Sequence, residues 1–273
     1  MTCLVMGIVN RTPDSFYDGG RMGLDESVRH AVALVEEGAD VLDLGGVRAG
    51  PGPHVTEQEE RGRLLPLVEA LRAEVDVPLS VETHRAGVAE AAIAAGAGIV
   101  NDVTMLSDPG LAGVVARSGV QLVVMHHGGQ IRGRPRNPRY EDVVASVGAA
   151  LLAGADEAIA AGVDPSRIVV DAGLDFGKNT YHSLELVRRT QELAGLGYPL
   201  LVAPSRKDVV GETLGLPPDD RLEGTLALVA LSVWGGASIV RVHDVKATVR
   251  TVRMVEAVMG TRAPAAPVRG LWE

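Results

Sequence analysis

One stretch of this 273-residue chain puts two cations, a hydroxyl and a carboxylate directly after a strand-like apolar run. The run from Pro199 to Ala203 ends at Pro204 and is followed by Ser205-Arg206-Lys207-Asp208. Apolar residues from Val209 onward predict a short helix behind these charges. Cations next to helix N–H groups suit an anionic or polar heteroaromatic ligand. The alternative is an ordinary solvated strand end, so the other strand ends must decide.

Polar residues also end the other apolar runs. A lone polar residue often does no more than close a strand, but a set that converges on one face favours a ligand site. The set comprises Asn10, Asp43, Glu82, Asn101-Asp102, Met125-His126, Asp171, Ser205–Lys207 and Arg241–His243.

These residue types suit a bicyclic heterocycle with a 2-amino-4-oxo edge. Such an edge needs a carboxylate that accepts two N–H groups, together with an amide and a cation for the ring nitrogens and the carbonyl. Asp171 or Glu82 can supply the carboxylate, Asn101 the amide and Lys207 the cation.

A second group of strand ends suits a pyrophosphate. Arg241 and His243 are two positions apart, so both point to the same side of their strand. With Asn10 from a neighbouring strand they can grip a pyrophosphate and a divalent metal, whose shell substrate oxygens and water would complete. The sequence has no Walker A motif, dinucleotide glycine motif, Cys/His zinc spacing or esterase serine motif.

The helices and strands that carry these residues follow a repeated sequence pattern. An Ala-rich helix ends in glycine, which suits a left-handed C-cap, and a continuous apolar strand follows at once. Continuous apolar strands are typical of a parallel sheet that is buried on both faces. The glycines of this pattern are Gly38, Gly96, Gly119, Gly162, Gly197 and Gly235-Gly236.

Eight strands alternating with eight helices predict a single (β/α)8 TIM barrel, an α/β fold. A doubly wound sheet is the alternative, although it usually has fewer strands. We expect a single barrel domain over residues 1–261 and a loose tail at 262–273. The helices are expected at 25–37, 57–74, 86–95, 108–118, 140–160, 181–194, 221–234 and 244–258.

Composition limits the class of protein. The formal net charge of −9 argues against a general nucleic-acid surface, and the single Cys3 fits a reducing compartment. No secretory signal is evident, and no apolar stretch is expected to reach membrane-spanning length. We therefore expect a soluble cytoplasmic protein without nucleic-acid or membrane partners.

Three loops are long for connections between a strand and a helix. Residues 11–24 and 45–56 are rich in Gly and Pro, as lids and binding loops often are. The third, 127–139, carries four arginines and is interpreted as a solvated basic loop rather than a phosphate clamp.

Taken together, the motifs resemble the dihydropteroate synthase family over about residues 4–258. The matching segments are Met6–Phe16, Asp18–Gly20, Ser80–Thr83, Asn101–Val103, Met125-His126, Asp171, Phe176–Lys178, Ser205–Lys207 and Arg241–Asp244. The resemblance implies a TIM-barrel transferase of folate biosynthesis that joins p-aminobenzoate to hydroxymethyl-dihydropterin pyrophosphate.

The resemblance also implies roles for individual residues. Asn10 would lie at a magnesium ion and would bind pyrophosphate together with Arg241 and His243. Lys207, Arg241 and His243 would be the catalytic residues. The pterin contacts would come from Glu82, Asn101, Asp171, Phe176, Lys207 and Arg241.

A homodimer is implied as well. Its candidate surface is formed by the last two helices. The first of these carries apolar residues at intervals of three and four positions, which place them as a stripe on one face of the helix. For most of the stripe, burial against the barrel is the favoured interpretation. The stripe consists of Leu226, Val229, Ala230, Val233 and Trp234.

The departures from the family pattern concentrate on the side of the second substrate, represented here by Arg48, Ser205 and Asp208. The loop Gly46–Gly52 loses the Glu, Ser, Thr and Arg of the family's Gly-Glu-Ser-Thr-Arg-Pro-Gly. Other departures are Arg11 for Val, Glu82 for Asp, Ala172 for Pro and Ala203 for Gly.

Asp208 is the most consequential departure, because the family has a Ser there that receives the aminobenzoate carboxylate. Two carboxylates about 4 Å apart at an effective dielectric of about 20 repel by roughly 4 kcal/mol. That energy corresponds to about a thousandfold in affinity. Asp208 is expected to cap the following helix instead. The pattern is similar to divergent actinobacterial paralogues with altered aminobenzoate-side loops.

Three functions follow from these observations. The first is a synthase-type enzyme that uses p-aminobenzoate weakly or uses a different amine. The second is a paralogue that binds pterin without the standard activity. The third is a methyltetrahydrofolate-type methyltransferase, which has no need for the pyrophosphate grip of Arg241 and His243 and is ranked last.

Overall fold

The computed structural model describes residues 2–11, 23–47, 54–129 and 137–269. Eight parallel strands close into a barrel in chain order, each paired with the next and β8 paired with β1. The predicted TIM barrel is thus confirmed, and the doubly wound alternative is excluded. The strands are β1 Leu4–Asn10, β2 Val41–Gly45, β3 Leu79–Glu82, β4 Ile99–Asp102, β5 Gln121–Met125, β6 Ile168–Asp171, β7 Leu200–Val202 and β8 Ile239–Val242.

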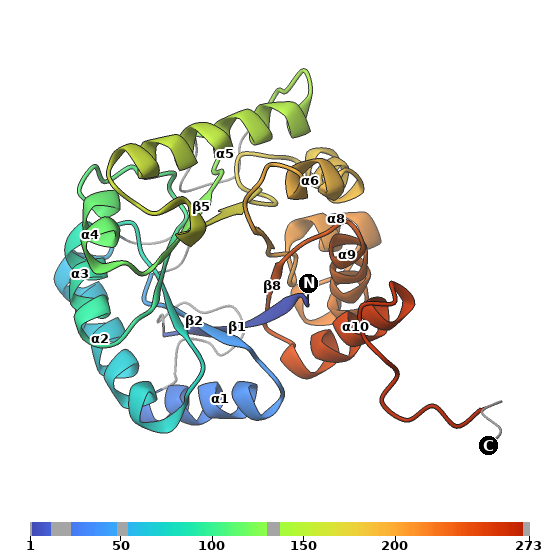
Figure 1. The fold of residues 1–273 in the computed structure, drawn as a ribbon, viewed down its shortest axis with the longest axis horizontal. Helices are drawn as coiled ribbons and strands as arrows, with labels where there is room; N and C mark the ends of the chain where they lie inside the picture. Colours follow the sequence, from blue (N-terminus) through green and yellow to red (C-terminus); the bar gives the residue numbers. More distant parts are fainter. Residues whose placement is uncertain (1, 12–22, 48–53, 130–136, 270–273) are drawn as a thin grey trace.

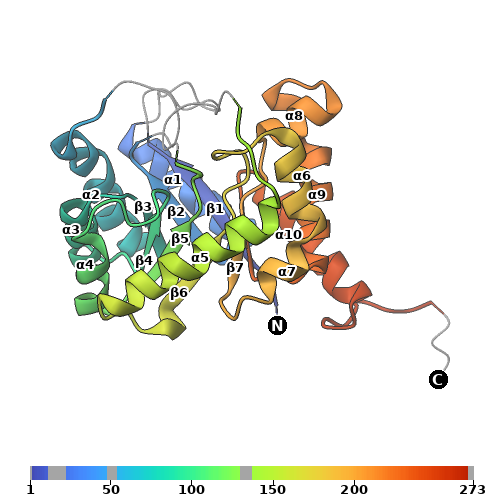
Figure 2. The ribbon, with the colours of Figure 1, turned by 90° about the horizontal axis from the view of Figure 1, so that it is seen from above.

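The helices surround the strands in a ring (Figure 1). Seen from the side in Figure 2, α8 lies at the end of the barrel opposite the N-terminus, where the strands finish. The predicted helix over 181–194 is two helices, and the short helix expected after the Ser-Arg-Lys segment is present. The helices are α1 Leu24–Glu36, α2 Glu57–Glu74, α3 Ala86–Ala94, α4 Leu111–Ser118, α5 Val143–Ala160, α6 Thr180–Arg188, α7 Thr190–Ala194, α8 Asp208–Leu214, α9 Leu222–Trp234 and α10 Val245–Val258.

The glycines of the repeated pattern adopt the backbone that was expected of them. Each has a positive φ, in a region that a side chain disfavours, so each can stop its helix and turn the chain into the next strand. The φ values are 104° at Gly38, 114° at Gly96, 69° at Gly119, 99° at Gly162, 93° at Gly197 and 96° at Gly236.

An apolar layer fills the interior of the barrel. Its side chains come from alternate positions of the strands, because successive residues of a strand point to opposite faces. This layer forms the floor on which the strand-end residues stand. It consists of Met6, Val41, Ile99, Val123, Val169, Leu201, Ala203 and Ile239.

Helix α5 corrects one expectation about the sequence. At 18 residues with a mean hydropathy of 1.6, it is long and apolar enough to cross a membrane. Its buried residues, among them Val147, Leu151 and Ala155, instead contribute to the core, and the helix packs on β5 and β6. The apolar length therefore belongs to a barrel helix.

Candidate active site

The strand-end residues share the inward side of their strands with the apolar floor. Asp43, Asn101, Asp171 and Arg241 each lie two positions after a floor residue, so their side chains project into the barrel one layer higher. All strands are parallel, so this layer lies at one mouth of the barrel. The predicted convergence of polar residues is a direct result of the strand register.

Arg241 is the centre of a buried ion-pair network. Its Nε donates to Asp43 Oδ2 and its Nη2 donates to Glu82 Oε2, both at 2.6 Å. Ser80 Oγ donates to Asp43 Oδ1 at 2.5 Å. Asp43 is fully buried. It was predicted as a strand-end residue but was given no role in the site. Its position two residues after Val41 on β2 indicated that it would point into the barrel as Val41 does.

Two carboxylates share the one guanidinium, and this affects their protonation. Burial, opposed by Arg241 and reinforced by Asp43, raises the pKa of Glu82 above its usual range. The same two carboxylates raise the pKa of Arg241 against its own burial. Arg241 therefore stays charged and acts at the site as a hydrogen-bond donor whose charge is already balanced.

Asn101 presents an acceptor to the mouth. Its Nδ2 donates to Asp43 Oδ2 at 3.2 Å, which fixes the orientation of the amide. Its Oδ1 is buried and has no hydrogen-bond partner within the described part of the chain. A buried acceptor without a partner carries a desolvation cost that a ligand N–H would remove.

Asp171, Lys207 and Phe176 form the opposite wall. Asp171 is buried and accepts the Gly173 N–H at 2.8 Å, and burial raises its pKa. Lys207 Nζ donates to the Leu174 carbonyl at 2.8 Å and lies 5.0 Å from the centroid of the Phe176 ring. A carboxylate, an ammonium group and an aromatic face therefore stand on adjoining strands and loops.

Lys178 ties the loops after β5 and β6 together. Its buried Nζ lies 2.7 Å from His126 Nδ1 and donates to the carbonyls of Gly173 and Phe176 at 3.0 and 2.8 Å. Burial lowers the pKa of Lys178 to about 7 and that of His126 to about 3. These contacts hold the loop that carries Asp171 and Phe176.

Ser205 and His243 form a pair at the ends of β7 and β8. The His243 N–H donates to Ser205 Oγ at 3.2 Å, and the same oxygen lies 2.9 Å from His243 Nδ1. The serine hydroxyl and the ring nitrogen therefore share one hydrogen bond, and the tautomer of the ring sets which of them donates. Burial, with help from Arg241, lowers the pKa of His243 to about 4, so the ring is neutral at pH 7. Ser205 therefore positions His243, although sequence analysis assigned it to the second substrate.

Asn10, at the end of β1, is the expected metal ligand. It faces β2, since a Cβ built on Gly45 would lie 2.6 Å from Asn10 Oδ1. Within the described residues no group of three His, Cys, Asp or Glu side chains could hold a metal. A single amide oxygen fits Mg²⁺ only when substrate phosphate oxygens and water supply the rest of the shell, as is usual for this ion.

Asp208 differs from expectation. The N-cap of α8 is Lys207, and Asp208 is the first helical residue, paired with Arg221 at 3.3 Å. An acidic residue in the first turn still suits the helix dipole. Arg221 balances part of the charge of Asp208. The repulsion between Asp208 and a ligand carboxylate is therefore smaller than the roughly 4 kcal/mol expected for two unpaired carboxylates. The other second-substrate residue, Arg48, lies outside the described residues.

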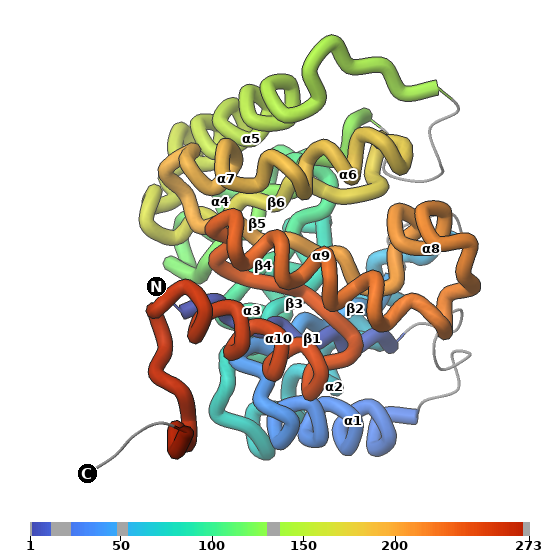
Figure 3. The backbone as a smooth tube through the Cα atoms, turned by 90° about the vertical axis from the view of Figure 1, so that its right-hand side faces the viewer, coloured from blue at the N-terminus to red at the C-terminus, as the bar shows by residue number. Residues whose placement is uncertain are grey.

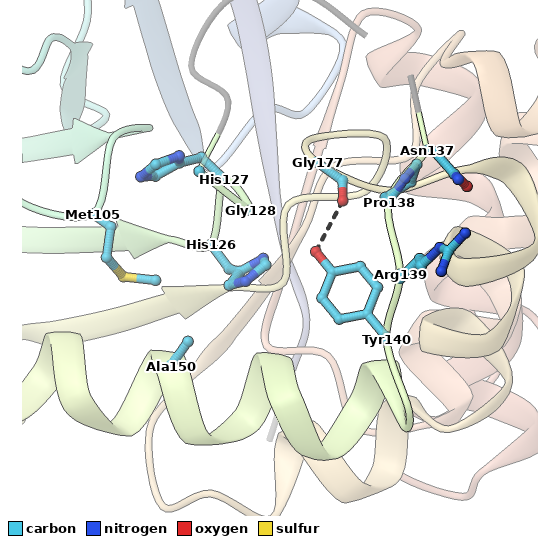
Figure 4. A pocket seen from close by; sticks show the side chains of 11 residues that line it. Met105, His126, His127, Gly128, Asn137, Pro138, Arg139, Tyr140, Ala150 and Gly177 are labelled. Atoms are coloured by element: carbon cyan, nitrogen blue, oxygen red, sulfur yellow. Dashed lines mark hydrogen bonds between the residues drawn. The ribbon is translucent and has the colours of Figure 1, made fainter. Parts of the chain in front are cut away.

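A pocket of about 720 Å³ lies beside this cluster, between the loops after β4, β5 and β6 and helix α5 (Figure 4). Met105, His126, His127 and Ala150 line one part of it, and the hydroxyl of Tyr140 donates to the Gly177 carbonyl at 2.8 Å across another. None of the predicted pterin residues lines this pocket. It is a neighbour of the candidate site, not part of it.

Comparison with known proteins identifies the family. The model of the family described as "Pterin binding enzyme" matches residues 6–243. The chain belongs to this family. "Inactive dihydropteroate synthase 2" of Mycobacterium tuberculosis (strain ATCC 25618 / H37Rv) is 48% identical over 275 residues, which cover 98% of this chain and 86% of the relative. The predicted resemblance to a divergent actinobacterial paralogue is therefore confirmed.

Solved structures agree. The Yersinia pestis dihydropteroate synthase in a sulfonamide drug complex is 39% identical with a TM-score of 0.92, covering 96% of this chain and 95% of that one. The Xanthomonas albilineans dihydropteroate synthase with 4-aminobenzoic acid is 42% identical with a TM-score of 0.88, covering 97% and 94%. The pterin binding enzyme is thus of dihydropteroate synthase type, a transferase family of folate biosynthesis.

Proposed function

We propose that this pterin binding enzyme binds hydroxymethyl-dihydropterin pyrophosphate at the barrel mouth and transfers the pterin-methylene group to an amine. The observation that carries the proposal is the unpartnered buried Oδ1 of Asn101, in the same inward layer as Asp171. Lys207 adds a cation beside them. Together they supply the acceptors and the donor that a 2-amino-4-oxo edge needs.

The reaction requires little covalent chemistry from the protein. The bond between the methylene carbon and the pyrophosphate oxygen breaks, pyrophosphate leaves with the electron pair, and the amine nitrogen bonds to carbon and loses a proton. Arg241, whose Nε and Nη2 are held by Asp43 and Glu82, and His243 beside it would donate to the leaving oxygens. Mg²⁺ held by Asn10 Oδ1 and the pyrophosphate would neutralise the leaving group.

The preferred amine is expected not to be p-aminobenzoate. Asp208 in the first turn of α8 supports this expectation, and so does the loss of Glu, Ser, Thr and Arg from the loop at 46–52. The printed name of the mycobacterial relatives, "Inactive dihydropteroate synthase 2", favours a second candidate function in which pterin binds without turnover.

Substrate assays separate these functions. With Mg²⁺ and pterin pyrophosphate, we expect product from p-aminobenzoate to form at least about 100-fold more slowly than with the Yersinia pestis enzyme as control, since a carboxylate repulsion of a few kcal/mol suffices for this factor. Product analysis by mass spectrometry with neutral aromatic amines decides between the candidates. Pterin binding without any product would favour the second function, and absence of pterin binding would contradict both.

We also propose the homodimer, with α9 and α10 as its surface. These helices lie side by side on one face of the barrel (Figure 3). Of the predicted stripe, Val229 and Val233 are buried against the barrel, whereas Trp234 is 60% exposed. The neighbouring apolar side chains that are also exposed are Leu231, Met254, Val258 and Met259. Such a two-helix apolar face suits a second copy of the chain.

Replacing Trp234 with Glu is expected to convert this dimer to a monomer, because it places a charge at the centre of the apolar face. The matched control is Tyr181→Glu on α6, where the aromatic ring is 81% exposed and lies outside that face. Sedimentation velocity measures the outcome. A dimer that survives Trp234→Glu would contradict this surface.

We place the protein in the cytoplasm as part of the same proposal. Folate-type reactions take place there, and Cys3, the one cysteine of the sequence, is a buried free thiol that needs no oxidising compartment.

A further inference from the structure

Asp175 has an unusual backbone at a functional position. It lies in the connection between β6 and α6, directly before Phe176, and has a φ of 67°. Few residues other than glycine adopt this left-handed region, and Asp is among those that tolerate it best. The conformation turns the Asp175 side chain away from its own loop and toward α8.

The carboxylate of Asp175 bridges two helices. Its Oδ2 accepts the backbone N–H of Val209 at 3.0 Å, across 34 residues of sequence. Its Oδ1 accepts the hydroxyl of Ser183 at 2.9 Å, and the Asp175 N–H donates to that hydroxyl at 3.0 Å. Ser183 is fully buried in α6, so the bridge is fixed at both ends.

Asp175 therefore adds a second carboxylate to the first turn of α8. Asp208 is the first residue of that turn, and Val209, whose N–H Asp175 takes, is the second. The N–H groups of Val210 and Gly211 already donate to the Lys207 carbonyl. A ligand carboxylate that approached this turn would meet two carboxylates and an N–H that is already used. Arg221 balances Asp208 in part, and Lys207 and Lys178 act on Asp175.

The arginines of this side are already engaged by carboxylates of the chain. Arg221 is paired with Asp208 at 3.3 Å, and its Nη1 also donates to the Arg206 carbonyl at 2.9 Å. Arg206 is itself paired with Asp244 at 2.7 Å. Both guanidinium groups thus face carboxylates of the chain itself.

We propose that Asp175 is a specificity-determining residue that excludes anionic second substrates. By occupying the Val209 N–H with a fixed carboxylate, it directs the site toward an aromatic amine without a negative charge. This inference rests on the proposed function, because it concerns the partner of the bound pterin. It assigns the exclusion to Asp175 and Asp208 jointly.

The test uses the full chain saturated with hydroxymethyl-dihydropterin, inorganic pyrophosphate and Mg²⁺, a combination without an activated leaving group, so that the amine probes bind without reacting. Two probes of nearly equal shape, 4-aminobenzoate and 4-aminobenzamide, are titrated against it by calorimetry. The wild type is expected to bind the neutral amide at least about tenfold more tightly than the carboxylate. The double variant Asp175→Gly/Asp208→Ser is expected to shift this ratio at least about tenfold toward the carboxylate. Glu212→Gln on α8 is the control for the loss of one charge and is compared with the single variants.

Single variants separate the contributions of Asp175 and Asp208 to the preference between the two probes. Asp208→Ser alone is expected to shift the ratio less than the double variant, because Asp175 still holds the Val209 N–H. Asp175→Asn removes the charge while it keeps the size and an acceptor, so it shifts the ratio even if the glycine variant folds poorly. A merely structural role for Asp175 would lower the melting temperature and leave the ratio unchanged.

Failure of the proposed function and failure of the role of Asp175 give different results. If the wild type does not bind pterin pyrophosphate, the proposed function falls and this inference falls with it. If pterin binds with unchanged affinity in all variants but the preference between the two probes does not move, the role of Asp175 is overturned and the proposed function stands.

Discussion

Replacing Arg241 with Met is expected to lower the free energy of unfolding by about 3–5 kcal/mol at pH 7, the usual cost of removing one partner of a buried ion pair. The reason is that Asp43 and Glu82 both direct carboxylate oxygens at this guanidinium from a buried layer. Without it, two carboxylates remain close together in a poorly hydrated space. In a barrel of this size the loss corresponds to roughly 6–20 °C in Tm.

The pH dependence of this variant follows from the sign of the carboxyl shifts. Glu82 already has a raised pKa in the wild type, and removal of the cation raises it further. A carboxyl whose folded pKa exceeds its unfolded value binds more protons in the folded state, so stability increases as the pH falls through the folded pKa. The deficit of Arg241→Met is therefore expected to shrink between pH 8 and pH 5.

Urea denaturation at several pH values measures both effects. Arg253→Met, on the exposed side of α10, is the matched control, and the double variant Glu82→Gln/Arg241→Met is expected to recover part of the loss. A deficit for Arg241→Met that equals that of the control, or that grows as the pH falls, would contradict the ion-pair account.

Replacing Asp171 with Asn is expected to weaken pterin pyrophosphate binding by roughly 10- to 150-fold. Asp171 is buried at the mouth and accepts one N–H from Gly173, so an acceptor position remains for the ligand. In the Asn variant, the side-chain NH2 can face the N–H groups of the pterin, which need an acceptor. A hydrogen bond to a charged group contributes about 1.5–3 kcal/mol, and this variant would lose it. Lys207 and Arg241 both act on this carboxyl, so its charge is part of the balance of the site.

Calorimetric titration with pterin pyrophosphate gives the size of this effect. Asp156→Asn, at an exposed position of α5, is the control for the loss of one charge. A dissociation constant for Asp171→Asn within twofold of the wild type would remove Asp171 from the pterin site.

The sequence was sufficient to predict the barrel, because the fold depends on repeated local features. A glycine with a positive φ follows six of the helices and turns the chain toward the next strand, and each continuous apolar run forms a strand of the closed barrel. Once the strands are parallel, alternation places Asn101, Asp171 and Arg241 at one mouth without further information. Local sequence features therefore predicted the fold and the end of the barrel at which these polar side chains gather.

Contacts between distant residues were not predictable in the same way. Asp43 was recognised as a strand-end residue, but its pairing with Arg241, 198 residues later, depends on how the barrel closes. Asp175 reaches Val209 only because of a left-handed backbone that its residue type does not require. Asp208 was expected to cap α8, yet the tertiary position of Arg221 draws it into an ion pair. Each of these depends on packing rather than on sequence pattern.

The division of the site into two halves follows from these contacts. On the proposed pterin side, the buried Oδ1 of Asn101 has no partner among the described residues, and Asp171 and Lys207 supply a carboxylate and an ammonium group at the same mouth. On the second-substrate side, Asp175 and Asp208 already occupy the first turn of α8. The proposed combination of a retained pterin site and an altered partner site is consistent with a relative that carries the name "Inactive dihydropteroate synthase 2".

Titration of the wild-type chain with hydroxymethyl-dihydropterin pyrophosphate in the presence of Mg²⁺ tests the central claim most directly. We expect one binding site per chain and a Kd between about 1 μM and 1 mM, the usual range for enzyme substrates. Absence of binding heat up to that limit, in a chain whose Tm does not rise with the ligand, would contradict the claim that the barrel mouth is a pterin site.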